Sequence, residues 1–583
     1  MQASHQLGSY GRLASTIGIT LLVLLACGPA EKASSPSNEA PSPATIATKV
    51  VRFAVQTEFA YLVQYGHVPT ANPGPERFYV FHSNLTVFDA EGNPQPLMAQ
   101  KVPTIQDGDW KLNPDGTMEV TWKIRPGVLW QDGTPLTAQD FAFGFEVLVD
   151  PRLVVDGGTE NLKDVSGVRA TDAQTLVVSW RAPWIYANSN HHEGIPALKR
   201  DQIEPLYRSL DPVAFADSQV WRSEFVGLGP YRATEWVLGD HITAVAFDRF
   251  FLGRPKIDRV EYHWVAVTQL AAQTLAGSID SFGVGAFGKG NQLAEIQQQK
   301  GPSWGTWFLD RVLARGLNLN HREGGAWAQD VRFRQAMAYS LNRPAMAEAV
   351  AGPHGERTDY VLDQSSPVYK LAEQRGVPKY SFDPTRAAQL FAEAGWAKGA
   401  DGLLRNRAGQ TVDFPCCRYP DADAENTRES LIWGDALKQA GIDAHHPIPA
   451  APAGLTGTDL RKARNFGWAG MTTHIYLTPR QHFLTLSSAV IPDDANRWTG
   501  TNNGAYSNPA YDKLLAERLT TLPITERREK EVQLVKILAE EVPFLVVYYL
   551  GNPIVARDGI TGVSRQAVLN DAYTVNIHQW DMK

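Results

Sequence analysis

The stretch RPGVLWQDGTPLTAQDFAFGFEVL, from Arg125 to Leu148, carries the most detailed local structural signal in the chain. Asp132-Gly133 is a turn pair. Thr137 and Asp140 have the spacing of a helix start, in which a hydroxyl and an acid three residues later bind free N–H groups. Apolar residues then recur at i, i+4 and i+7, in Phe141, Phe145 and Leu148. The stretch therefore predicts a turn and then a helix with one apolar face.

Neighbouring segments favour strands and helices in alternation. Met118 to Ile124 alternates apolar and polar residues, as in a half-buried strand. Lys49 to Val55 predicts a buried first strand, and Phe544 to Leu550 is continuously apolar, as in a sheet covered on both faces. Asp383-Pro384 predicts another capped helix. The predicted fold class is α/β with mixed sheets.

Length and charge limit the function further. The chain has 583 residues, too many for one hydrophobic core, so we expect two or three lobes. Its net charge is −7 and its pI about 6.1. Phosphate neutralisation requires a basic surface, and this balance is acidic, so we expect no nucleic-acid partner.

The N-terminal segment predicts export. An apolar run from Ile17 to Ala26 follows Arg12 and fits the core of a secretory signal. Leu24-Leu25-Ala26-Cys27 looks like a bacterial lipobox, which implies a lipoprotein signal peptide over 1–26 and a membrane anchor by lipid at Cys27. Residues 27–48 are rich in Pro, Ser, Ala and Glu and are typical of a flexible tether. An ordinary signal peptide or an N-terminal membrane anchor are the alternatives. Gly28 leaves inner-membrane and outer-membrane attachment both open.

Catalytic and metal-binding motifs are missing from the sequence. It contains no GxSxG, P-loop, GxGxxG or HExxH pattern. His191, His192 and Glu193 are consecutive, so neither a strand nor a helix would direct all three toward one ion, and a solvated loop is the expected structure. Cys416 and Cys417 are expected to be two thiols, because adjacent cysteines rarely bridge. We expect no enzyme activity, no metal and no cofactor.

Five stretches in order resemble bacterial extracellular solute-binding proteins of the oligopeptide/dipeptide-binding type, the receptors of ABC importers. They are Arg125 to Leu148 above, Gly227 to Val265, Asp330 to Val350, Phe382 to Trp396, and Asn502 to Leu519 followed by Glu540 to Tyr549. The likeness covers residues 49 to about 562.

The resemblance implies a type II periplasmic-binding fold of cluster C type, with two lobes and a small extra domain. It assigns 49–88, 201–312 and 545–583 to lobe I, 89–200 to the extra domain and 313–544 to lobe II. The ligand is expected in a cleft that closes by hinge motion. The expected partners are permease subunits, with the receptor itself monomeric at the extracytoplasmic face.

The segment WAGMTTHIYLTP, Trp468 to Pro479, bears on the ligand. In peptide-binding members the matching region carries an aspartate for the peptide ammonium, whereas this chain has Gly470 to Thr473 there. A peptide, an oligosaccharide or another extended solute therefore stay open as ligands, and Asp493 or Asp494 stay open as a replacement acid. The predicted ligand-binding residues are Asn84, Trp468, Thr472, Thr473, His474, Trp498, Asn502 and Asn503.

Two other classes of function remain as alternatives. One is a hydrolase or surface lipoprotein that shares the fold, which would need a nucleophile and base in the cleft. The other is a ligand-sensing adaptor lipoprotein that reports the closed state to a membrane kinase.

Overall fold

A computed structural model describes residues 48–63, 77–89, 92–153, 162, 164–191, 194–283, 290–418, 420, 424–477, 482–563 and 573–583. The predicted signal peptide, Cys27 and nearly all of the tether lie outside these residues, as do His192 and Glu193. No helix in the described part of the chain is long and apolar enough to cross a membrane.

One large mixed sheet organises the described chain. Its strand order is β17-β16-β18-β12-β19-β11-β1-β10-β9-β8, with β13 (Glu356–Arg357) paired to β19. We call β1, β8, β9, β10 and β11 the first half: Val50–Val55, Tyr231–Val237, His241–Ala246, Arg259–Trp264 and Ser281–Phe282. We call β16, β17 and β18 the second half: Asp413–Cys417, Asp443–His445 and Gly470–Tyr476.

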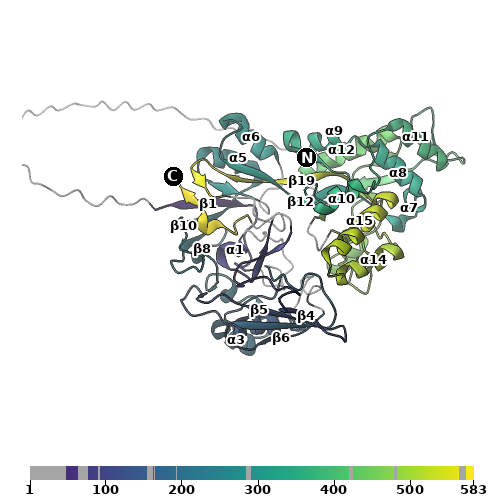
Figure 1. Cartoon of the computed structure of the whole chain (residues 1–583). Helices are drawn as coiled ribbons and strands as arrows, with labels where there is room; N and C mark the ends of the chain where they lie inside the picture. Colours follow the sequence, from purple (N-terminus) through teal and green to yellow (C-terminus); the bar gives the residue numbers. More distant parts are fainter. Residues whose placement is uncertain are drawn as a thin grey trace, which may run out of the picture. The chain divides into compact units, whose positions relative to one another are not determined.

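Two long strands cross between the halves. They are β12 (Thr306–Leu319) and β19 (Phe544–Ala556), which pair antiparallel with each other along most of their length (Figure 1). β19 pairs with β11 in the first half, and β12 pairs with β18 in the second. The sheet is therefore continuous, and the two halves are joined by the backbone of these two strands.

Helices cover the second half on both faces. One core contains side chains of α8, α9, α11 and α12 against Phe414, Leu317 and Tyr548; the other contains α10, α14 and α15 against Ala314, Ile475 and Tyr549. These helices span Val331–Ser340, Arg343–Ala351, Pro384–Glu393, Ala424–Ala440, Pro367–Gln374, Pro509–Thr520 and Ile524–Glu541. Burial of Phe544 to Tyr549 on both faces confirms the interpretation of that apolar run.

The first half is covered differently. On one face α5 (Val267–Ala276) and α6 (Gly290–Lys300) pack over Ala54, Phe282 and Val555. The other face buries Phe53 and Tyr262 against α1 (Phe78–Phe81) and Trp580. The shorter helices elsewhere are α7 (Ala326–Gln329) and α13 (Gly457–Ala463), and the two-stranded sheets are β2–β3 (Thr86–Phe88, Pro94–Pro96), β14–β15 (Ala397–Lys398, Leu404–Arg405) and β20–β21 (Ile560–Thr561, Asp581–Met582).

A separate four-stranded sheet, order β4-β5-β7-β6, lies within the predicted extra domain. Its strands are Trp110–Leu112, Met118–Lys123, Thr175–Trp180 and Val165–Ala170. α2 (Ala138–Leu148) has the predicted capping box, since the Asp140 carboxylate accepts from the Thr137 N–H at 2.8 Å. α3 (Arg200–Ser209) and α4 (Pro212–Ala216), which the predicted division gives to lobe I, pack on the other face of α2.

We call this four-stranded sheet together with α2 the small sheet unit. Gln131 joins it to the first half. Its Nε2 donates to the carbonyls of Tyr231 at 2.6 Å and Gly229 at 3.1 Å, and its Oε1 accepts from Gly227 N at 3.0 Å. The hydrophobic core of the small sheet unit also includes Leu228, which lies just before β8. The small sheet unit and the first half therefore share both a buried polar bridge and apolar packing.

Candidate ligand-binding site

The carboxyl ends of parallel strands mark the candidate site. β16 is parallel to both β17 and β18, with Cys417 opposite Met471, and the chain leaves β16 to begin α12. In the first half β1 is parallel to β10 and β11. Open α/β sheets bind ligands outside the carboxyl ends of their parallel strands, so the side chains near these ends in the second half form the candidate site.

A buried ion pair lies beside β18. Arg315 on β12 donates through Nε to Glu429 Oε1 at 2.9 Å and through Nη2 to Oε2 at 2.5 Å. The Tyr548 hydroxyl of β19 donates to the same carboxylate. Both ions are only about 5% exposed. Burial alone would raise the pKa of Glu429, but the Arg315 charge and these hydrogen bonds hold it below its usual value.

Asn426, in the first turn of α12, joins this pair to a second guanidinium. Its Oδ1 accepts from Arg315 Nη2 at 2.9 Å and from Arg418 Nη2 at 3.1 Å. Arg418 follows directly after β16. The polar network therefore extends from the buried middle of β12 to the half-buried Arg418 at the carboxyl end of β16.

His474 lies next to this network. It is opposite Arg315 in the β12–β18 ladder, so the two side chains share one face of the sheet. Burial, together with the charges of Arg315 and Arg418, lowers the pKa of His474 to about 4. His474 is therefore neutral at neutral pH. We call His474 and the Arg315 network beside it the wall of the candidate site; it presents an uncharged imidazole beside fixed guanidinium groups.

The other predicted residues of β18 and its approach differ in exposure. Thr472 is fully buried, and its hydroxyl donates to the Cys417 carbonyl at 3.0 Å. Trp468 is also buried, and its indole N–H donates to the Arg464 carbonyl at 3.0 Å. Thr473 is half-buried on the opposite face of the strand from His474. Trp468 and Thr472 support the wall by these contacts.

Three further predicted residues lie at the other end of β18. The Trp498 indole donates to Asp494 at 2.7 Å, and the Asn503 carbonyl accepts from Arg322 at 2.8 Å. Asn502 is fully buried, and its amide donates to Ser487 and Tyr506 carbonyls. The Gly504 carbonyl of this loop accepts a hydrogen bond from His321 N. His321 lies just after Asn320, at the edge of the sheet where β12 ends and β18 begins. The structure does not bring it together with His474.

Asn84 has a structural environment in the small sheet unit. It is 1% exposed, its amide donates to the carbonyls of His191 and Ile195, and its Oδ1 accepts from Leu85 N. Asn84 thus joins the chain after α1 to the loop that contains His191.

Cys416 and Cys417 differ from expectation. Their sulfur atoms are bonded, so the prediction of two thiols is wrong. The prediction rested on the short Cα separation across one peptide; the two Cα atoms lie 3.2 Å apart, below the usual disulfide range, and the sulfur atoms are bonded all the same. Both side chains are fully buried in the core under α12. Among the described residues, no group of three or more His, Cys, Asp or Glu side chains could hold a metal ion.

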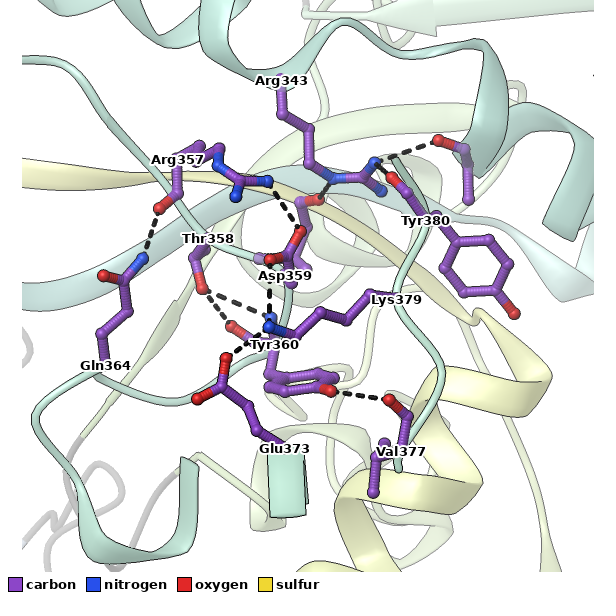
Figure 2. Close-up of polar contacts among 12 residues, drawn as sticks. Arg343, Arg357, Thr358, Asp359, Tyr360, Gln364, Glu373, Val377, Lys379 and Tyr380 are labelled. Carbon is purple, nitrogen blue, oxygen red and sulfur yellow. Dashed lines mark hydrogen bonds and ion pairs between the residues drawn. The ribbon is translucent and has the colours of Figure 1, made fainter. Parts of the chain in front are cut away.

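Two hollows elsewhere have other properties. The first lies beside the buried Arg343, whose guanidinium donates to the carbonyls of Val546, Ala338 and Tyr380 (Figure 2). Its volume of about 30 Å³ holds no more than a water molecule, so it is not a solute site. The second, about 580 Å³, lies between the starts of α2 and α3, where Lys199 pairs with Asp132 and Asp201.

Two parallel-strand groups joined by two crossing strands, with polar side chains at a carboxyl end, define a two-lobed solute-binding protein. Residues 93–470 match the family described as bacterial extracellular solute-binding proteins, family 5 Middle, and the chain belongs to that family. This confirms the resemblance and the fold class. The chain is a binding protein and not an enzyme, acts outside the cytoplasm, and is the substrate-binding component of an ABC importer.

Three proteins similar to this chain carry names or titles that mention peptide or nickel ligands. The chain is 25% identical over 519 residues to an oligopeptide-binding protein, AppA, of Bacillus subtilis, covering 86% of each chain. It superposes with TM-score 0.69 and 20% identity on NikZ from Campylobacter jejuni in complex with Ni(L-His), covering 92% of this chain and 100% of that one. An oligopeptide-binding protein from Thermus thermophilus, complexed with a pentapeptide, gives TM-score 0.66 and 21% identity, covering 91% and 96%.

Sequence reasoning missed the network behind His474. Arg315, Asn426, Glu429 and Tyr548 come from three elements far apart in the chain. The available signal was a single arginine inside the apolar strand segment Val312 to Leu319. A buried arginine requires a partner, but nothing local identifies Glu429 as that partner.

Proposed function

We propose that this receptor captures a peptide or related extended solute between two lobes built on the two sheet halves and delivers it to an ABC permease, while a lipid at Cys27 holds it at the membrane. The similarity to proteins named for oligopeptide binding supports the peptide class. Rotation about β12 and β19 would let the halves close on the solute.

The observation that carries the proposal is the wall at His474. A polar network with fixed charges lies at the carboxyl end of β16, where α/β folds bind ligands. The half-buried His474 on β18, with Thr472 on the same face of the strand, is our proposed ligand-facing side chain. The remaining predicted ligand residues stay predictions: Asn84, Trp468, Thr473, Trp498, Asn502 and Asn503.

A second candidate, an oligosaccharide, is favoured by the same strand. Residues 470–475 contain no acid, and His474 is neutral at neutral pH, so a solute ammonium at this strand would face guanidinium groups instead of a carboxylate. Asp493 and Asp494 lie with Trp498 at the other end of β18, and Asp494 already binds Trp498 and Lys462. Hydroxyl groups suit threonine and imidazole partners.

Native mass spectrometry on protein purified from its own host distinguishes these ligands. The expected result is a co-purifying series of masses that differ by amino-acid residues. A series that differs by hexose or pentose units would instead support the oligosaccharide candidate. His474→Ala should reduce the bound fraction at least tenfold, while the exposed control His445→Ala should not. Full ligand retention in His474→Ala would place the ligand away from β18 and contradict the assigned wall.

A further inference from the structure

The small sheet unit also contacts the second half. Residues 184–187 follow β7 and lie against α14. Ile185 N donates to the Leu519 carbonyl at 3.2 Å, and the Tyr186 hydroxyl accepts from Arg518 Nη2 at 2.7 Å. Leu522, just after α14, packs against the core of the small sheet. This contact joins the small sheet unit to the second half, and no strand of the large sheet takes part in it.

Arg518 is held in place mainly by the second half. It is 1% exposed, and its Nε donates to Glu531 on α15 at 2.9 Å. Its guanidinium lies 5.5 Å from the Phe483 ring and 5.6 Å from the Tyr186 ring. Glu531 lies on α15, which covers the second half, and Phe483 packs in the same core as α15. Arg518 therefore keeps its counter-ion when Tyr186 moves away. The Arg518–Tyr186 contact is therefore separable without leaving an isolated buried charge.

The small sheet unit must move with the first half. Gln131 and the shared packing at Leu228 fix it there, whereas its contact with α14 consists of a few side chains and one backbone hydrogen bond. If the two halves rotate about β12 and β19, the contact at Tyr186 separates while the polar bridge at Gln131 persists.

We propose that Tyr186, Ile185 and Arg518 form a latch that holds the two halves in the closed arrangement. The latch contributes no group to the proposed solute wall. It raises the population of the closed state, and solute affinity rises in proportion to that population. This inference concerns the chain's own conformational equilibrium and does not depend on which solute binds.

The test uses full-length chain that native mass spectrometry shows to be bare. Tyr186→Phe keeps the ring and removes the acceptor oxygen; Arg518→Lys keeps the pair with Glu531 and loses the arm to Tyr186. The matched control is Tyr360→Phe, whose hydroxyl donates to the Val377 carbonyl inside the second half. Hydrogen exchange at the Ile185 amide reports separation of the contact, and small-angle scattering reports opening of the molecule.

Loss of one hydrogen bond to a charged group corresponds to about a tenfold change in the open population. We therefore expect Ile185 exchange to accelerate about tenfold in Tyr186→Phe and Arg518→Lys, with a larger radius of gyration, and neither change in Tyr360→Phe. Faster exchange without a change in radius would mean a local contact only, and unchanged exchange would mean no latch; either overturns the proposal. Both outcomes leave the ligand measurement, and with it the proposed function, unaffected.

Discussion

At the scale of single residues, the Arg315–Glu429 pair is the most consequential feature. Two ions about 5% exposed have lost nearly all of their hydration. Their mutual charge, the Tyr548 hydroxyl and the Asn426 amide replace it. Removing one partner leaves the other as an uncompensated buried charge, which costs more than the pair itself contributes.

Glu429→Gln should therefore lower the free energy of unfolding by about 3–5 kcal/mol, measured by urea denaturation. Glu517→Gln, which disrupts an exposed pair with Lys530 at 3.0 Å, is the control and should cost less than about 1 kcal/mol. Replacing both Arg315 and Glu429 by leucine should recover most of the loss. A single variant as stable as the control would show that Arg315 reaches water or another acid.

At the scale of elements, Asp140 begins two helices at once. Its Oδ2 accepts from the Thr137 N–H at 2.8 Å at the start of α2, and its Oδ1 accepts from Arg200 N at 3.2 Å at the start of α3. Burial raises the pKa of Asp140. Its carboxylate accepts hydrogen bonds from backbone N–H groups at the starts of both helices. One carboxylate thus fixes the position of α3 relative to α2.

Asp140→Ala should cost about 2–3 kcal/mol of unfolding free energy, because free N–H groups remain at two helix starts. The matched control is Asp383→Ala, since Asp383 caps only α11 through Arg386 N at 2.9 Å, and about 1 kcal/mol is expected. Thermal unfolding of both variants measures the difference. Equal losses would mean that the Arg200 contact contributes nothing.

At the scale of the whole molecule, Gln131 couples the small sheet unit to the first half. Gln131→Leu leaves the Tyr231 and Gly229 carbonyls without this donor, at a cost of about 3 kcal/mol. We expect the small sheet unit to unfold before the rest, visible as faster proteolysis within residues 100–190. Gln100→Ala, which removes one bond to the Ile124 carbonyl, should leave the digestion pattern unchanged. If proteolysis of Gln131→Leu is instead accelerated equally along the whole described chain, packing alone maintains the coupling.

Local patterns predicted the elements better than the site. The Thr137–Asp140 spacing and the apolar run from Phe544 gave the correct helix start and the correct doubly covered strand, because both depend on neighbouring residues. Trp468 stays a predicted ligand residue, and the hydrogen bond from its indole to the Arg464 carbonyl four residues earlier is a local contact that the sequence pattern did not indicate. The Arg315–Glu429 contact joins residues 114 positions apart, and no periodicity encodes such a pairing.

The arrangement of β19 beside β11 and β12 affects how the chain can be made. The core of the first half joins Phe53, near the start of the described chain, to Tyr573, Ile577 and Trp580, more than 500 positions later. A ribosome must therefore translate through residue 580 before this core can close, and the loop-closure entropy of such distant contacts slows its formation. Until then the core of the first half stays incomplete in the nascent polypeptide, whereas the cores that contain Phe333 and Trp122 need no residue beyond Tyr549.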